Sequence, residues 1–211
     1  AFIFTPQRAF FFFFWVYLFL VSIAVGSLAL VALEYLVGAT WSTPFRRVSE
    51  IMASMIPVLI LLAIPLFFGL HDLFHWTHTE VVETDAILKA KSPYLNVEFF
   101  AIRTAFCLFL WFLFYWLITK NSEKQDIDGD VKYTKRNITL STIFAPVFII
   151  TITIAAIDWA MSLEPHWFST IFGVYYFAGT IIAALAATTF ASIKLKEGGY
   201  LDKSLGDDSF Y

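Results

Sequence analysis

Cysteine is almost absent from this sequence: Cys107 is the only one among 211 residues. A single thiol excludes a disulfide within the chain, a covalently attached c-type haem and an iron–sulfur cluster ligated by cysteines of this chain. Cys107 lies in the middle of an apolar run, where a thiol behaves as a small packing residue. Stability and function must therefore come from other groups.

Charged residues are scarce as well. They make up 15% of the sequence, whereas 59% of the residues are hydrophobic and 25 residues are Phe. A water-soluble domain of this length would leave much of that apolar surface in contact with water. A β-barrel is excluded because the apolar runs are continuous and do not alternate at every second residue. The composition therefore indicates a helical protein in a lipid bilayer.

Five apolar segments are long enough to cross a bilayer as helices, since about 20 residues at the α-helical rise span a hydrocarbon core of about 30 Å. We predict an all-α membrane protein, a polytopic bundle of about five transmembrane helices in a single domain over residues 1–211. The predicted spans are about 9–37, 51–70, 99–118, 138–162 and 169–193.

The basic residues are distributed unevenly between the two sides that these spans define. Ten Lys and Arg residues lie in 38–50, in 119–137 and after the fifth span, whereas three lie in the loops of the other side. By the positive-inside rule, 38–50, 119–137 and the C-terminal end face the cytoplasm, and residue 1, the loop 71–98 and the hairpin 163–168 face outward. We expect 119–137 to be a solvated linker.

Both ends of the sequence indicate a piece of a longer protein. The sequence begins with Ala1 and shows no signal peptide, although an outward-facing N-terminus requires translocation. The polar stretch 203–211 ends without a closing element. We therefore expect further sequence beyond these ends.

Small residues and prolines predict how the spans pack. Ser22, Gly26 and Ala29 lie on the first span, where small side chains let another helix approach closely. Pro57 and Pro65 each remove a hydrogen bond from the second span, which we expect to be bent or broken at two places. A stripe in the fifth span is expected to pack on a helix of this chain or of a partner, and it consists of Gly179, Ala183, Ala187 and Ala191.

The most informative segment is 158–173, where one apolar run ends in a carboxylate and the next begins after a short turn. Ionisable groups at the rim of a span are costly unless they are paired or hydrated. Arg103 in the third span and Asp158 in the antiparallel fourth span lie at similar depth, so we predict an ion pair or a small shared hydrated cavity. The pair is either a structural salt bridge or a protonatable site in which Arg103 keeps the carboxylate ionised until a proton arrives.

Glu164 and His166 lie two residues apart in the hairpin. A carboxylate beside an imidazole could pass protons between the membrane interior and the water outside. Alternatively, both residues belong to an exposed turn that Trp167 and Phe168 anchor at the interface. The sequence favours neither interpretation.

Three histidines follow the second span. If that helix continues, His71 and His75 share a face at four-residue spacing and could bind one metal ion. A solvated histidine cluster at the interface is the favoured interpretation, and neither a haem nor a metal site is predicted. The cluster is a candidate docking surface formed by His71, Asp72, His75 and His78.

Three motifs resemble those of one family. They are Tyr-Leu-Asn-Val-Glu-Phe-Phe-Ala-Ile-Arg at 94–103, Asp-Trp-Ala-Met-Ser-Leu-Glu-Pro-His-Trp-Phe-Ser-Thr-Ile-Phe-Gly at 158–173 and Lys-Glu-Gly-Gly-Tyr-Leu at 196–201. In this order the sequence resembles the F-type integral membrane subunit of bacterial alternative complex III, one of the NrfD/PsrC-like membrane proteins. The likeness covers nearly the whole chain. Family members are about twice as long, so the sequence resembles their N-terminal to central half.

The resemblance implies a subunit of the bacterial inner membrane, with the outward-facing segments in the periplasm, in a complex that oxidises quinol and passes electrons to cytochrome c or to an oxidase. It implies no cofactor in this chain: haem c and iron–sulfur clusters belong to partner subunits, and quinol binds the NrfD-like sister subunit. The implied partners are these c-type haem, iron–sulfur and sister subunits, a terminal oxidase and lipid, with no nucleic acid. The proton route of the F-type subunit would involve Arg103, Asp158, Glu164 and His166.

Two other functions stay open. A purely structural scaffold would dock haem-carrying subunits through the loop 71–98 and would carry out no proton chemistry. A secondary transporter would place its site at the second span with its two prolines. Transporters usually carry ionisable or unwound elements at mid-membrane in repeated halves. The transporter is less favoured, because the predicted mid-membrane is nearly free of charge and no other span repeats this pair of prolines.

Overall fold

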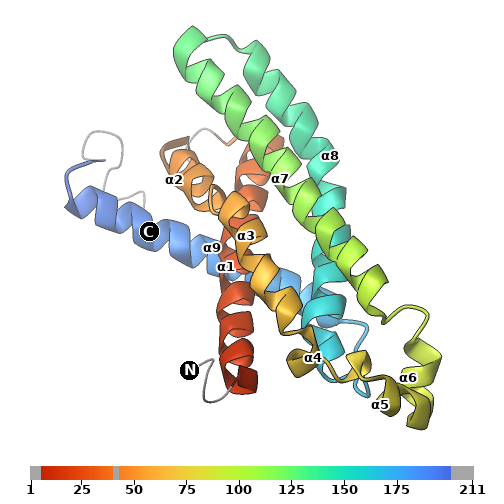
Figure 1. The fold of residues 1–211 in the computed structure, drawn as a ribbon. Coiled ribbons are helices and arrows are strands. Elements are labelled where there is room, and N and C mark those ends of the chain that lie inside the picture. Colours follow the sequence, from red (N-terminus) through yellow and green to blue (C-terminus); the bar gives the residue numbers. More distant parts are fainter. Residues whose placement is uncertain (1–5, 40–42, 201–211) are drawn as a thin grey trace.

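The computed structural model describes residues 6–39 and 43–200. In these residues every regular element is helical, and five helices are long and apolar enough to cross a membrane (Figure 1). The predicted all-α bundle is confirmed, and the chain is a multi-pass membrane protein. The five spans, two of which contain more than one helical element, are Gln7–Val37, Phe45–Phe68, Val97–Asp128, Lys132–Leu163 and Phe172–Glu197.

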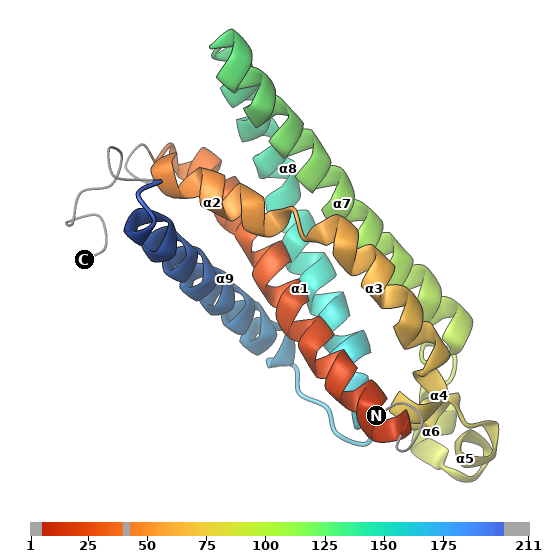
Figure 2. The same cartoon turned by 60° about the vertical axis from the view of Figure 1, so that its left-hand side comes forward.

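Helix α1 lies at the centre of the bundle, where it contacts α2, α3, α8 and α9. A further helix, α7, packs on α8 and α3. In Figure 2, α9 runs beside α1 on the side away from α7. The helices are α1 (Pro6–Val37), α2 (Thr43–Ala53), α3 (Ile56–Phe68), α7 (Val97–Asp128), α8 (Lys132–Ala155) and α9 (Phe172–Glu197).

Another helix does approach the small residues of α1 closely: α9 packs at Ser22 and Gly26. A Cβ atom on Gly26 would lie 2.6 Å from the Thr180 carbonyl oxygen and 2.8 Å from Ala184 Cβ. One turn earlier, the hydroxyl of Ser22 donates to the Tyr176 hydroxyl at 3.3 Å. Glycine at residue 26 is therefore required by the close approach of the two helices, which places polar side chains of both within reach of each other.

The stripe predicted in α9 is not the face that this helix buries within the chain. Its buried face carries Gly173, Thr180, Ala184, Thr188 and Ser192. A Cβ atom on Gly179, by contrast, would meet nothing within 4 Å. The predicted stripe is displaced from the buried row by one residue, or about 100° around the helix axis, so its small residues lie beside the contact with α1 and not in it.

The second span is broken once. Helix α2 ends at Ala53 and α3 begins at Ile56, so that Pro57 occupies the first turn of α3, where its missing N–H costs no intrahelical hydrogen bond. Pro65 lies inside α3, which continues through it to Phe68. The break near Pro57 is confirmed, and the helix is not broken at Pro65.

Two segments predicted as loops are helical, and these predictions are wrong. The segment 38–50 contains most of α2, and 119–137 is a helical hairpin in which only 129–131 separates α7 from α8. Gly129 makes this turn with a positive φ of 66°. Polar side chains pair across the hairpin, since Asn121 donates to Asn137 at 2.9 Å and Gln125 to Thr134 at 2.7 Å. The hydrophobic run ends near residue 118, but the helix does not.

The two ends of the bundle differ. The loop end holds the start of α1 and the short elements α4 (Leu70–Leu73), α5 (Thr79–Thr84) and α6 (Ala86–Lys91), whereas the hairpin end holds the α7–α8 turn (Figure 1). Helix α8 continues at the loop end as the π-helical turn η2 (Ala156–Ala160) and the 3-10 turn η3 (Met161–Leu163). These turns meet the start of α7, and the candidate site is formed there.

Candidate functional site

Arg103 and Asp158 form the predicted ion pair. Arg103 Nε lies 2.5 Å from Asp158 Oδ2, and the exposed fractions of the two side chains are 10% and 1%. The arginine comes from the second turn of α7 and the carboxylate from η2, so the two antiparallel helices meet at these residues. Water screens a buried pair only weakly, and each charge therefore depends on the other.

Tyr94, just before α7, completes the site. Its hydroxyl donates to Asp158 Oδ1 at 2.9 Å, and its carbonyl oxygen accepts from Arg103 Nη1 at 3.1 Å. The guanidinium carbon lies 3.9 Å from the centre of the Tyr94 ring. Burial raises the pKa of Tyr94 to about 12, and the negative charge of the Asp158 carboxylate is the second cause of this rise. The hydroxyl therefore stays protonated at neutral pH and acts as a donor.

The π-helical turn η2 sets the direction of Asp158. The extra residue of such a turn rotates the helix that follows, and single π turns are frequent at functional sites. Here it buries both Asp158 and Trp159 against α7, with exposed fractions of 1% and 3%. The Ser162 hydroxyl donates to the Asp158 carbonyl oxygen, which gives a partner to a backbone group at the end of the helix.

Two tryptophans close the site toward the membrane interior. Trp159 Nε1 donates to Thr104 Oγ1 at 3.0 Å, and Trp111 Nε1 donates to Thr151 Oγ1 at 2.8 Å. Their rings lie 5.8 Å apart, edge to face at 85°. Both indole N–H groups therefore have partners, as buried polar groups require, and the ion pair lies between this layer and the loop end.

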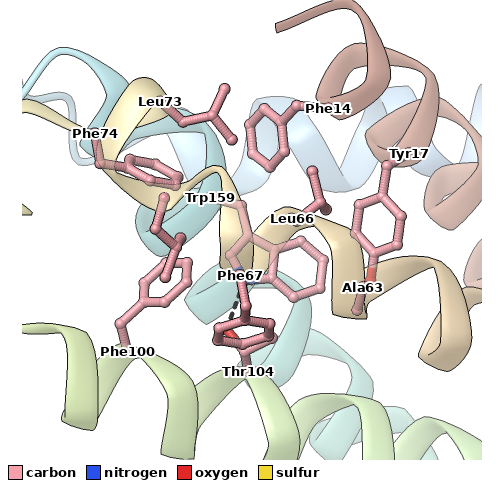
Figure 3. A pocket seen from close by; sticks show the side chains of 11 residues that line it. Phe14, Tyr17, Ala63, Leu66, Phe67, Leu73, Phe74, Phe100, Thr104 and Trp159 are labelled. Carbon is pink, nitrogen blue, oxygen red and sulfur yellow. Dashed lines mark hydrogen bonds between the residues drawn. The ribbon is translucent and has the colours of Figure 1, made fainter. Parts of the chain in front are cut away.

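A small cavity of about 20 Å³ lies beside the tryptophan layer (Figure 3). Apolar atoms line the cavity, although Tyr17 and Thr104 are among the residues that surround it. The Tyr17 hydroxyl is buried without a hydrogen-bond partner. About 10–15 Å³ is enough for one water molecule, whereas small-molecule sites measure about 300 Å³ or more. The cavity is therefore too small for a quinone ring or a haem.

The geometry allows Asp158 to hold a negative charge away from bulk water. Arg103 and Tyr94 each donate to one of its carboxylate oxygens. Arg103 Nη2 is buried and has no hydrogen-bond partner. A buried charged donor without a partner is costly. Arg103 Nη2 can therefore donate to one further hydrogen-bond acceptor.

His166 has a closer acidic partner than the predicted one. Its Nε2 lies 2.5 Å from Asp85 Oδ2, whereas its Nδ1 lies 3.8 Å from Glu164 Oε1. Asp85 caps α6 and accepts from the backbone N–H groups of Ile87 and Leu88. The Leu88 N–H and the His166 imidazole contribute to a pKa of Asp85 below its ordinary value.

A second contact, a hydrogen bond from Lys91, holds the same hairpin in place. Lys91 Nζ donates to the Pro165 carbonyl oxygen at 2.6 Å. Together with the His166–Asp85 pair, it holds 164–168 against α6. Within residues 6–39 and 43–200, no hydrogen bond or ion pair joins His166 to Asp158. The structure therefore shows two neighbouring clusters at the loop end and no direct link between these two groups.

The histidines after α3 do not share a helix face. Helix α4 ends at Leu73, so the continuous helix that would align His71 with His75 does not exist. His71 and His78 stack instead, with ring centres 3.7 Å apart, and His78 Nε2 lies 2.9 Å from the His71 carbonyl oxygen. In the described part of the chain, no group of three or more His, Cys, Asp or Glu residues is placed to hold a metal ion. Asp72 is half-buried beside them.

Sequence reasoning missed two charge clusters at the hairpin end. Arg46 Nε lies 3.0 Å from Glu34 Oε2. Arg47 lies between Glu50, whose Oε2 is 2.6 Å away, and Asp126 of the α7 hairpin. The spacing of Arg47 and Glu50, three residues apart, was a usable signal once 43–53 is taken as a helix.

No family model and no curated protein matches this sequence. A functional assignment therefore depends on the geometry of the site and on the motif resemblance.

Proposed function

We propose that the chain is an accessory integral membrane subunit of a respiratory quinol-oxidising complex of the alternative complex III type, and that Asp158 is a protonatable group near its outer face. The observation that carries the proposal is a carboxylate that is 1% exposed at the end of a span and held by Arg103 and Tyr94. Ionisable groups at such a depth are functional candidates. The motif resemblance supports the type of complex.

In this proposal the loop end faces the periplasm of the bacterial inner membrane and the hairpin end faces the cytoplasm. The excess of Lys and Arg in 38–50 and 119–137 supports that orientation. Haem c, iron–sulfur clusters and quinol would be bound by partner subunits. The loop 71–98, with His71, Asp72, His75 and His78, would contact the haem-carrying subunits.

The proposed role of Asp158 follows from its donors. Arg103 and the neutral Tyr94 hydroxyl each donate to one oxygen of the Asp158 carboxylate. Binding of a proton to Asp158 would weaken its contacts with Arg103 and Tyr94. Arg103 would then be released toward the loop end, where Glu164 and His166 face water. The Glu164–His166–Asp85 cluster would then exchange the proton with the periplasm.

Asp158→Asn in the assembled complex tests this proposal. Asn keeps the shape and can still accept from Tyr94, but it cannot bind a proton. We expect quinol turnover and proton release to fall together, measured with a quinol analogue and a pH-sensitive dye in sealed vesicles. Glu80→Gln is the matched control for loss of a carboxylate at the same end, because Glu80 is exposed on α5 and lies outside the proposed path, and it should alter proton release less. Unchanged turnover and unchanged proton release in Asp158→Asn would contradict the proposal.

A structural scaffold is the second candidate. One observation favours it: both oxygens of Asp158 have partners within the chain, as in a salt bridge that only fixes helix packing. In that case Asp158→Asn would lower the amount of assembled complex, and the complex that does assemble would have normal turnover.

A further inference from the structure

Two grooves flank α1 in its half nearer the hairpin end. The first, here called the hydroxyl groove, lies between α1, α2 and α9 and has a volume of about 310 Å³. The second, the apolar groove, lies between α1, α8 and α9 and measures about 210 Å³. Only apolar side chains line the second, including Ala145 and Ile181. The two grooves therefore differ in chemistry more than in size.

Two hydroxyls in the first groove are poorly satisfied. Ser49 and Thr188 are 1% and 6% exposed, and their side-chain oxygens lie 3.5 Å apart. This distance is well beyond the ordinary 2.7–2.8 Å between hydroxyl oxygens. Some other hydroxyls of the spans donate to the carbonyl four residues back at normal distance, as Thr180 does at 2.8 Å and Ser192 at 2.8 Å, whereas the buried hydroxyls of Ser27 and Ser141 have no partner among the described residues. Among the described residues, the Ser49 and Thr188 hydroxyls have only each other as hydrogen-bond partners.

The groove combines apolar walls with a few polar side chains. Its deeper wall is formed by Leu30, Leu33 and Leu185. Toward the hairpin end it reaches Glu34, which is paired with Arg46 at 3.0 Å. Leu33 is 52% exposed, so the groove opens toward the hydrocarbon that surrounds the bundle. An apolar chain fits the deep part, and an oxygen-bearing head fits the shallow part.

We infer that the hydroxyl groove binds one amphiphile, with its apolar chain along Leu30, Leu33 and Leu185 and a hydrogen-bonding oxygen of its head on Ser49 and Thr188. The volume of about 310 Å³ lies at the lower end of the range for small-molecule sites, which suits a head and the first part of a chain. Two sources share this chemistry: the ester region of a phospholipid and the carbonyl of an isoprenoid quinone. The inference does not depend on the function proposed above.

Native mass spectrometry of the full chain in detergent tests the inference. The probes are a palmitoyl-oleoyl phosphatidylglycerol and a ubiquinone with a short isoprenoid tail, added separately. We expect one of them to bind saturably at one copy per chain. In Ser49→Ala and Thr188→Val, each of which removes one hydroxyl, the Kd should rise about twofold to tenfold, the range expected for one lost hydrogen bond.

Two further variants keep the test decisive. Leu185→Trp fills the groove from a half-exposed residue and should abolish binding, whereas Thr142→Val removes an exposed α8 hydroxyl that already bonds Ile138 and should leave it unchanged. Circular dichroism confirms that each variant is folded. Binding of the phospholipid alone or of the quinone alone identifies the source and supports the inference. No saturable binding of either probe overturns it, as does binding that Leu185→Trp and the two hydroxyl variants leave intact.

Discussion

Removing Arg103 should destabilise the protein far more than removing an exposed charge. In Arg103→Met the Asp158 carboxylate, 1% exposed, loses its charged partner and cannot reach water by a simple rotation. Breaking a buried pair from one side costs about 3–5 kcal/mol. Asp158→Asn should cost less, about 1–3 kcal/mol, because the arginine left behind lies nearer the loop end and is 10% exposed.

The double variant separates the pair from simple packing loss. Arg103→Met combined with Asp158→Asn contains no unpaired buried charge, so its stability should return to within about 1 kcal/mol of the Asp158→Asn value. Lys194→Met is the control, since Lys194 and Glu197 form a pair that is 58% and 59% exposed. An exposed pair of this kind contributes about 0–1 kcal/mol.

The single cysteine provides the assay. Cys107 is 1% exposed and is the only thiol, so a dye that fluoresces on reacting with thiols reports unfolding of the core during a thermal ramp. For a chain of this size each kcal/mol corresponds to about 2–4 °C in Tm. We therefore expect a fall on the order of 10 °C for Arg103→Met, checked by circular dichroism to distinguish local opening from unfolding. A fall no larger than that of Lys194→Met, or no recovery in the double variant, would refute the argument.

Three further predictions concern other contacts. Gly26→Leu should prevent α9 from docking on α1, because its Cβ alone would lie 2.6 Å from the Thr180 carbonyl oxygen; the measurement is the yield of folded protein after size-exclusion chromatography, and a normal yield contradicts the packing described. Tyr94→Phe should destabilise the protein by about 1–2 kcal/mol through loss of the charged hydrogen bond to Asp158, and a thermal shift equal to zero would show that this bond contributes nothing. Because the folded-state pKa of Asp85 is lowered, its contribution to stability is present above its unfolded pKa and is lost as pH falls through the folded value; the protection of the α6 amides, corrected for the intrinsic pH dependence of exchange, should therefore fall in acid, and this fall should be absent in Asp85→Asn.

Much of the helical architecture could be predicted from hydrophobicity, and the rest depended on polar contacts that hydrophobicity does not report. The Arg103–Asp158 pair could be predicted from the positions of the two residues alone, since both charges lie near the same end of antiparallel spans. Tyr94 was missed because an aromatic residue before a span has an ordinary role at the membrane interface. The hairpin at 119–137 was missed because its helices are held by amide and hydroxyl pairs beyond the apolar run.

The orientation of α9 shows a second limit. Small residues four apart predicted a contact stripe at Gly179, but the buried row is the adjacent one that includes Thr180. The choice between adjacent rows depends on how α1 crosses α9, and that crossing is set by long-range packing. Likewise, the partner of His166 is Asp85, which is 81 residues away in the sequence. No local pattern indicates that neighbour.

Helices α7 and α8 are tied together at three successive levels: Arg103 to Asp158 of η2, Trp111 to Thr151, and Asn121 to Asn137. About 18 residues of α7 separate the outer two ties, a length of about 27 Å. Two helices joined by contacts at three levels bend together and resist sliding past each other. A protein that binds the α7–α8 turn can therefore act on the Arg103–Asp158 pair at the other end of the two helices without entering the lipid.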